Sequence, residues 1–578
     1  MTAALTAQRG LVLAGMVCGL SLGTGGKPTL AQDVDEGIMR RQQEYLERLE
    51  QERLKPFLAP PPAEDDVAPT PTEDTLGDAP CFDIHTITLE GPKATTSVPT
   101  RDLTDPLLGQ CLGMAEIDRL VRDLTAAYVE AGYVTTRVYI PQQSLKSGTL
   151  KLVVIEGTLD GFETGLSGLE RSNLAMAFPG LTGEVLNLRD LEQGLDQINR
   201  LSRYNLKMML EPGQKQGGTT VALSGHRQKA WQVHSSVDNS GSQATGATVA
   251  GLQGTLEDML GLNEQWTVNW KGGPVPVTGP GRNESLSGAL SLPVGWWLLS
   301  LSANRFTYSN PISGLNRIID SRGVSRTRKL RLDRVVHRDN ASKTVAAGAV
   351  TVKDSVNYVQ GLRIAASSRR LAVGSLDVTH SRRVLGGALS VTVGTDVGLR
   401  AFGAEKDGDQ PSHAARAQFR KYRLNMNYWR PLPSPVEGID VEWTSALSGQ
   451  WSRHTLFSTE RISAGGPYSV RGFKDQSISG DVGGWWRNDL RLTLPPTGIT
   501  SLDQVMGRPY ISTGFDGGWI RPDHRDAFER GTVTGLSATL GMRGGAVNGS
   551  FTVGRALRVP QFLRPKKTVF YFTLSTAF

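Results

Sequence analysis

The chain ends in the residues Phe570-Tyr571-Phe572-Thr573-Leu574-Ser575-Thr576-Ala577-Phe578, whose pattern is the clearest indication of the fold. Side chains alternate between the two faces of a strand, so the apolar residues of this stretch fall on one face. These residues are Phe570, Phe572, Leu574 and Phe578. A terminal aromatic residue that closes an alternating strand is typical of barrels in an outer membrane. A β-sheet is stable in lipid only when it closes on itself, because closure pairs the backbone groups of every strand. The stretch therefore predicts the last strand of a transmembrane antiparallel β-barrel.

The same alternation runs upstream from the terminal stretch to about residue 229. Within 421–428 and 439–451, one face is aromatic or aliphatic and the other is charged or polar. A soluble β-sandwich alternates too. The many charges on one face, with aromatic residues at the strand ends, favour a lipid-facing wall around a wet lumen. At about 22 residues per strand and connection, residues 227–578 hold sixteen strands, an even number as in bacterial barrels.

The composition fits this interpretation without requiring it. Charged residues make up 21% and hydrophobic residues 39%, as in many soluble proteins. After about the first 25 residues, the apolar runs stay below the ~18 residues of a membrane-spanning helix. The net charge is +7, and one basic run, Arg326-Thr327-Arg328-Lys329-Leu330-Arg331, stands out. Such a run can bind nucleic acid. In an exported barrel we expect lumen-facing strand charges instead, and no nucleic-acid partner.

The N-terminus predicts export. Arg9 precedes the apolar stretch 11–20, and Thr29-Leu30-Ala31 resembles a cleavage site, which makes 1–31 a secretory signal peptide. The mature chain then keeps Cys81 and Cys111. In an oxidising compartment a disulfide between them is expected. The alternative is a metal or thiol site, but the sequence has no accompanying CxxC or HExxH pattern, and no metal site is predicted.

A polar helix is predicted next, within residues 32–55. Its stripe of apolar residues between Glu36 and Leu54 is too narrow for an ordinary core. The helix would be about 28 Å long, close to the ~25 Å apolar height of a barrel wall. It suits a wet channel, as a plug, although an exposed helix without a docking site would show the same pattern. The Pro-, Ala- and acid-rich residues 56–80 indicate an extended linker.

Two small modules of mixed helix and strand follow the linker. In 81–157, strands are expected at 82–87, 133–140 and 150–155, around an amphipathic helix at 114–131. Residues 158–226 repeat this theme, with a helical stripe near 188–198 and strands at 205–210 and 219–223. The cysteines would tie the first strand of the first module to the segment that leads into its helix.

Several motifs in this order resemble one family, the two-partner secretion transporters, or TpsB group, of the BamA-type superfamily. The resemblance runs from about Cys81 to Phe578. The motifs are Gly132-Tyr133-Val134-Thr135-Thr136-Arg137-Val138-Tyr139-Ile140-Pro141-Gln142-Gln143, Gly148-Thr149-Leu150, Glu156-Gly157, Glu211-Pro212-Gly213, Gly217-Gly218-Thr219-Thr220 and Val237-Asp238-Asn239-Ser240-Gly241. The first three are similar to the first POTRA domain of the family, the next two to the end of the second, and the last to the first barrel hairpin.

The most specific motif is Val470-Arg471-Gly472-Phe473 within 465–473. The resemblance implies that this tetrad lies at the tip of a long extracellular loop folded into the lumen. It also implies that Arg471 pairs with an aspartate of a later strand, which matches Asp516 in Gly514-Phe515-Asp516-Gly517-Gly518. Gly480-Asp481 and Arg487-Asn488-Asp489 resemble the strand after the loop. The family more often has Glu at the position of Asp489.

The resemblance implies a transporter in the outer membrane of a Gram-negative cell, with its POTRA domains in the periplasm. Its partner would be a large β-helical secreted exoprotein (TpsA-like), of haemolysin or adhesin type, bound through the POTRA domains. Outer-membrane lipid and the barrel assembly machinery are the other expected partners, and a monomer is expected. No nucleotide motif and no nucleophile–base constellation is found, so neither a cofactor nor enzyme activity is predicted. The alternatives are an insertase for other barrels and a passive porin, and surface adhesion is a further, secondary role open to the extracellular loops. An insertase predicts more POTRA domains, and a porin predicts none.

Overall fold

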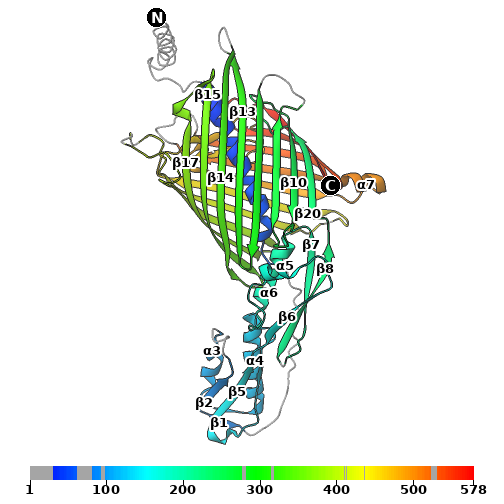
Figure 1. The fold of residues 1–578 in the computed structure, drawn as a ribbon. Helices are drawn as coiled ribbons and strands as arrows, with labels where there is room; N and C mark the ends of the chain where they lie inside the picture. The colour runs from blue at the N-terminus through cyan, green and yellow to red at the C-terminus, as the bar shows by residue number, and fades with distance from the viewer. Residues whose placement is uncertain are drawn as a thin grey trace.

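The computed structural model describes residues 30–61, 81–92, 98–215, 217–275, 281–313, 318–408, 411, 413–434, 436–522 and 530–578. The signal peptide expected at 1–31 lies almost wholly outside these residues, and so does most of the linker expected at 56–80. Figure 1 shows a barrel with two small domains beneath one end. We call that end of the barrel proximal and the opposite end distal.

The barrel closes from sixteen antiparallel strands among the described residues, as the sequence predicts. In chain order they are β9 Trp231–Asp238, β10 Val249–Glu257, β11 Gln265–Gly273, β12 Arg282–Val294, β13 Trp297–Ser313, β14 Ile318–Arg338, β15 Ser342–Val359, β17 Arg369–Val384, β18 Gly387–Gly398, β19 Arg420–Leu432, β20 Asp440–Ser452, β23 Gly483–Thr493, β24 Gly507–Ile520, β25 Gly531–Gly544, β26 Val547–Arg558 and β27 Thr568–Ala577. A two-residue strand, β16 Leu362–Arg363, and the 3-10 turn η3 Ala365–Ser367 extend the connection from β15 to β17.

The terminal strand closes the barrel against the first one. β27 pairs with β9 from Thr573, opposite Asp238, to Ala577, opposite His234. Phe578 adds a backbone hydrogen bond, because its N–H donates to the Val233 carbonyl at 3.0 Å. The outward face exposes the expected aromatic and aliphatic residues: Phe570, Phe572, Leu574 and Phe578. Their inward neighbours Val569 and Tyr571 are buried, so the alternation separates lipid face from lumen.

The basic run does not lie in the lumen as a whole, and that expectation is wrong for half of it. Lys329 is half-buried and Arg331 buried inside the barrel, whereas Arg326 and Arg328 are exposed on the outer face of β14. The reason is the period of a strand: consecutive residues point to opposite faces, so an unbroken run of charges cannot share one side.

The first small domain is built on a three-stranded sheet in the order β2-β5-β4. A second pair, β1 with β3, lies beside it, and α4 buries Ile117, Leu120 and Leu124 in the domain core. The elements are β1 Phe82–Ile84, β2 Thr86–Glu90, α3 Arg101–Thr104, η1 Asp105–Leu107, β3 Gln110–Leu112, α4 Met114–Glu130, β4 Arg137–Tyr139, η2 Leu145–Ser147 and β5 Thr149–Ile155.

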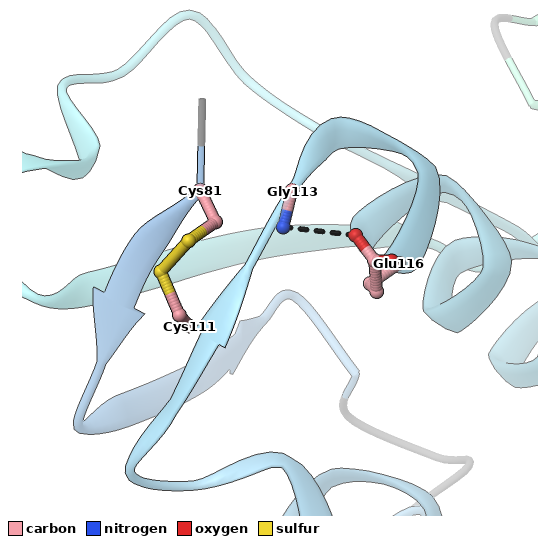
Figure 2. Close-up of a disulfide and its surroundings, with 4 residues drawn as sticks. All are labelled: Cys81, Cys111, Gly113 and Glu116. Carbon is pink, nitrogen blue, oxygen red and sulfur yellow. Dashed lines mark hydrogen bonds between the residues drawn. A yellow bond between two sulfur atoms is a disulfide. The ribbon is translucent and has the colours of Figure 1, made fainter. Parts of the chain in front are cut away.

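Two local expectations in this domain differ from the structure. The strand expected over 82–87 is broken at His85, because β1 pairs with β3 while β2 pairs with β5. The strand expected over 133–140 is confined to β4, since turns occupy the residues before it. In Figure 2 a disulfide joins Cys81 to Cys111, next to the start of α4, where the Gly113 N–H donates to Glu116 Oε2 at 2.9 Å.

The second small domain has the sheet order β6-β8-β7, covered by two helices. Leu191 and Ile198 of α6 pack on Val221 of β8 and Leu206 of β7 in its core. The sequence pattern does not predict the short helix α5. The elements are β6 Thr158–Thr164, α5 Arg171–Ala177, α6 Leu188–Asn199, β7 Tyr204–Pro212 and β8 Gly218–Arg227.

A long helix, α2 (Leu30–Leu58), runs through the barrel, drawn in blue inside the green wall in Figure 1. It extends beyond both ends of the stripe from Glu36 to Leu54. Three further pieces lie between β20 and β23: η4 Ser458–Glu460, β21 Ile462–Ala464 and β22 Ile478–Gly480. α7 (Thr500–Met506) connects β23 to β24. Among the described residues, no helix has both the length and the apolar composition needed to span a bilayer.

Candidate functional site

The connection from β20 to β23, residues 453–482, folds into the barrel, and we call it the inward loop. Its strands β21 and β22 pair as a hairpin, and β21 contacts both β23 and β24 of the wall. Val470 and Phe473 of the hairpin tip are fully buried, in a cluster with Ile520 and Val533 of the wall. This apolar contact fixes the tip of the inward loop against the inner face of the barrel.

Arg471 lies between two carboxylates of the wall. Its Nε and Nη2 donate to Asp516 Oδ2 and Oδ1, each at 2.7 Å, and its backbone N–H donates to Oδ2 at 2.9 Å. Nη1 also donates to Asp489 Oδ1. Arg471 is 4% exposed and Asp516 is 0% exposed. The bidentate fork is the geometry that guanidinium and carboxylate prefer, so the structure brings together the two residues that the resemblance paired.

Asp489 is a second partner of Arg471 that the sequence does not predict, although Asp489 belongs to the motif Arg487-Asn488-Asp489. It sits on the inward face of β23 and also accepts from Arg487 Nε at 3.0 Å. Arg487 in turn donates from Nη1 to the Pro467 carbonyl of the inward loop at 2.9 Å. Two arginines therefore share two aspartates, and the buried charges balance. The alternation of a strand could have placed Arg487 and Asp489 on one face, but it does not predict that the preceding loop folds back against them.

Two glycines make room for the Arg471 side chain and backbone. A Cβ at Gly514 would lie 2.1 Å from Arg471 Nη2, so any side chain there would displace the guanidinium. Gly472 has φ +131° and lies against the backbone of β26, where a Cβ would come within 2.8 Å of the Ala556 nitrogen. Only glycine adopts such a conformation freely, which explains the glycine inside the tetrad.

The helix α2 fills the lumen beside the inward loop and is held by charges. Glu50 Oε2 lies 2.6 Å from Lys329 Nζ on β14. Arg41 lies 3.7 Å from Asp475 of the inward loop. The guanidinium carbon of Arg48 is 4.4 Å from the ring centroid of Tyr468, also in the loop. The helix thus contacts both the wall and the loop.

Apolar contacts hold α2 near its two ends. Leu54 and Phe57 pack on Leu298, Val335 and Val345 of β13, β14 and β15. The other contact joins Ile38 and Met39 to Phe306 and Tyr308 of β13. Beside the middle of the helix, a cavity of about 460 Å³ reaches to β9, β10 and β27, lined by residues such as Tyr45, Lys271 and Ser575. The helix α2 is therefore anchored at its ends and loosely packed along one side.

A chain of ion pairs along the inner wall connects α2 to the inward loop. The successive distances are Glu50–Arg331 3.9 Å, Arg331–Asp377 2.8 Å, Asp377–Arg423 2.8 Å, Arg423–Asp396 2.8 Å, Asp396–Lys421 3.6 Å and Lys421–Glu460 3.0 Å. Glu460 of η4 also binds Lys353 of β15 at 2.5 Å. No sequence pattern predicts these ion pairs, because the residues from Glu50 to Glu460 come from six separate helices and strands.

The second small domain is fastened to the proximal rim of the barrel. Tyr204 Oη donates to Asp258 Oδ2 at 2.5 Å, and Asn173 Nδ2 donates to Asp258 Oδ1 at 2.6 Å. Asp258 lies in the turn between β10 and β11. Burial, together with the hydrogen bond to Asp258, raises the pKa of Tyr204. At the proximal end of β14, Arg338 binds Asp196 of α6 at 2.6 Å. These two contacts hold the domain against the proximal rim of the barrel.

The two small domains present sheet edges and one hollow. In the first domain β2 and β4 are the outer strands of the sheet, and in the second β6 and β7 are. A hollow of about 650 Å³ lies along β6 and α5 and is lined by residues that include Phe162, Arg171, Leu174, Glu211 and Leu223. Such an edge, beside a hollow with both polar and apolar lining, can accept an extended segment as an added strand. Among the described residues, no cluster of three His, Cys, Asp or Glu side chains could hold a metal ion.

Known proteins match this chain over most of its length. The family model for haemolysin secretion/activation protein ShlB/FhaC/HecB matches residues 217–544, and two POTRA models, the first of ShlB type, match 82–157 and 158–212. The outer membrane transporter CdiB of Escherichia coli is 33% identical over 511 residues, 87% of this chain and 83% of the relative. The hemolysin transporter protein ShlB of Serratia marcescens is 30% identical, over 74% and 75%.

A solved structure of CdiB from Escherichia coli matches with a TM-score of 0.85 at 30% identity, covering 96% of this chain and 100% of that one. The small domains are thus two POTRA domains, and the resemblance drawn from the motifs is confirmed. Since the family model spans more than half of the sequence, the chain belongs to the ShlB/FhaC/HecB family of haemolysin secretion/activation proteins.

Proposed function

We propose that this chain secretes a large β-helical exoprotein by two-partner secretion. The barrel lies in the outer membrane, and the POTRA domains lie in the periplasm. One observation carries the proposal: the pore stands above two POTRA domains and is filled by two separate elements, α2 and the inward loop, both held by ion pairs. Contacts of this kind can exchange for water or for a passing chain, unlike a packed apolar core.

The proposed cycle starts in the periplasm. An unfolded segment of a TpsA-like exoprotein adds as a strand to a POTRA sheet edge, with alternate side chains in the hollow beside β6. Backbone hydrogen bonds supply the affinity, so many sequences can be accepted. The second POTRA domain, fixed to the proximal rim through Asp258 and Arg338, delivers the segment at the pore.

Opening of the pore requires α2 to leave. Its charged contacts with Lys329 and Asp475 break, and the linker over 56–80 lets the helix move without breaking the chain. The inward loop stays anchored through Arg471 and Asp516 and guides the exported chain along the wall. Folding of the exoprotein outside the cell drives the export. We propose the boundaries 1–31 for the signal peptide, 32–55 for the plug and 56–80 for the linker.

The chain is proposed to act without enzyme activity and as a monomer, inserted by the barrel assembly machinery. Cys81 and Cys111 would stabilise the first POTRA domain in the oxidising periplasm. The aromatic and aliphatic residues of the terminal strand, Phe570 to Phe578, would contact lipid and signal insertion. An insertase for other barrels would have less need of a plug held by charges, and a passive porin has no use for POTRA domains.

Secretion tests the proposal directly. The chain is expressed in a Gram-negative host together with the exoprotein encoded beside its gene, and the exoprotein is measured in the medium and in the periplasm. We expect it in the medium only when the chain is present. A variant that lacks both POTRA domains but still forms the barrel should leave it in the periplasm. Export at the normal level without the POTRA domains would refute the recognition step.

A further inference from the structure

Two arginines of the basic run 326–331 lie outside the barrel and take no part in the contacts of the lumen. Arg326 and Arg328 lie on the outward face of β14, and both are exposed. Arg305 of β13 stands directly opposite Arg326 in the strand register and is exposed on the same face. We call Arg305, Arg326 and Arg328 the outer arginine cluster. It places three guanidinium groups on adjacent positions of two neighbouring strands.

This cluster lacks counter-charges where its neighbours have them. Arg370 binds Asp354 at 2.9 Å, although Asp354 stands opposite Arg326 in the register. Arg322 binds Asp320 at 2.9 Å. In the part of the chain that the structure describes, no carboxylate lies within ion-pair distance of the three clustered arginines. Like charges directly opposite one another on a sheet repel. An external anion bound at the cluster would therefore reduce the repulsion among the three arginines.

The cluster lies near the level of the outer lipid head groups. On the same outward face, Arg334 stacks on Trp297 at 4.9 Å from the ring centroid, at the proximal end of the wall. Arg326 precedes Arg334 by eight residues in β14 and so lies about 27 Å from it along the strand, towards the distal end. With a strand tilt of about 40°, this is a height of about 21 Å, against the ~25 Å apolar band of such barrels. Leu330 and Leu332, both exposed, lie between the two ends.

We propose that the outer arginine cluster binds the phosphate groups of an anionic lipid of the outer leaflet. Guanidinium groups match phosphate in a planar fork and remain charged at any physiological pH. The acyl chains of the lipid would lie over Leu330 and its exposed register partner Leu301. This deepens the proposed contact with outer-membrane lipid. It rests on the membrane location of the barrel, but not on the secretion step.

Native mass spectrometry of the purified full-length protein in detergent tests the proposal. The protein is titrated with lipid A that carries two phosphates, with the same lipid dephosphorylated, and with phosphatidylethanolamine. We expect doubly phosphorylated lipid A to bind at least about tenfold more tightly than either of the others. Equal binding of the phosphorylated and dephosphorylated lipids would overturn the proposal, and this arm needs no variant.

A triple variant, Arg305→Gln with Arg326→Gln and Arg328→Gln, locates the site. We expect at least a tenfold loss of lipid A affinity, whereas Arg334→Gln, on the same face at the proximal end, should change it less than twofold. A heat-dependent shift in gel mobility verifies that each barrel is folded. Unchanged affinity in the triple variant would overturn the proposal.

Two further experiments distinguish lipid phosphate from free phosphate, and lipid binding from secretion. Inorganic phosphate at millimolar concentration should not displace lipid A; displacement would show a general anion site and overturn the lipid assignment. Exoprotein secretion is measured in the same variants. Loss of lipid binding with normal secretion supports the proposal, while unchanged lipid binding with lost secretion would assign the arginines to the exported chain instead.

Discussion

Glu50 of the plug helix lies 2.6 Å from Lys329 of the barrel wall, and each side chain is about one-fifth exposed. Glu50 is also 3.9 Å from Arg331, where the chain of wall ion pairs to the inward loop begins. A partly buried acid between two cations holds them only while it is charged and in place. The plug helix and the inward loop are therefore connected through one series of ion pairs, although they contact different strands of the wall.

Neutralising this contact should release the plug. In Glu50→Gln, Lys329 and Arg331 lose the carboxylate of α2, and the helix loses a contact at the wall. We expect more frequent and longer openings in planar lipid bilayers, with a several-fold rise in mean conductance. Glu52→Gln is the matched control, because Glu52 is 58% exposed and its one ion pair among the described residues lies within the helix, with Arg48. Equal conductance of Glu50→Gln and the wild type would show that this ion pair does not hold the plug.

Removal of the Arg471 side chain should uncouple the inward loop from the wall. Arg471→Ala leaves Asp516 buried without its guanidinium, at a cost of about 3–5 kcal/mol. We expect a barrel that still inserts, a loop that is cleaved faster by protease, and poor secretion of the exoprotein. In the double variant Arg471→Ala with Asp516→Ala, the loop should be less destabilised than the two single changes together predict. Normal secretion by Arg471→Ala would remove the central role given to the inward loop.

The sequence predicted the features of the fold that depend on local, periodic patterns of residues. The alternation that ends at Phe578 needs only neighbouring residues, and it indicated a barrel with outward aromatic groups. The pairing of Arg471 with Asp516 came from motifs shared with a family, since nothing in the spacing of 45 residues states that the two side chains meet. Asp489 was not predicted as a partner of Arg471, although the two residues are only 18 positions apart, because local patterns do not show that the loop folds back against β23.

The placement of the basic run and the contents of the lumen differ from the sequence prediction for one physical reason. The basic run was assigned to the lumen as a block, yet a strand must divide it between Arg328 outside and Arg331 inside. The contact of Glu50 with Lys329 joins residues 279 positions apart, and only the closed barrel brings them together. Fold class follows from patterns within segments, whereas the contents of a lumen depend on which segments face each other across it.

The docking of the second POTRA domain should weaken in strong base. The pKa of Tyr204 is raised by burial and by Asp258, so its folded-state value lies above the ~10 of an unfolded tyrosine. Its contribution to stability is complete below pH ~10 and is lost as the pH rises through the folded pKa. In a spectrophotometric titration, the difference between wild type and Tyr204→Phe should show one tyrosine that ionises above pH 10. A difference centred at pH 10 or below would contradict the buried hydrogen bond.

Loss of the disulfide should affect the first POTRA domain alone. Cys81 and Cys111 enclose a loop with a sequence separation of 30, and opening it typically costs about 2–4 kcal/mol. In Cys81→Ser with Cys111→Ser we expect secretion to fall at raised temperature, while the heat-dependent gel mobility of the barrel stays the same. A reducing agent added to the wild type should have the same effect. A barrel that melts earlier in the variant would place the disulfide in a wider role.

Two glycines of β24 separate the need for space beside Arg471 from the general properties of the strand. In Gly514→Ala the new Cβ would lie 2.1 Å from Arg471 Nη2, so the guanidinium must leave its place between Asp516 and Asp489. In Gly517→Ala the nearest neighbour is 4.0 Å away, on Thr534. The two changes add the same methyl group to the same strand. We expect Gly514→Ala to lose most secretion and to expose the inward loop to protease, with Gly517→Ala close to wild type. If both variants secrete equally, the close fit of Arg471 against β24 is not needed for export.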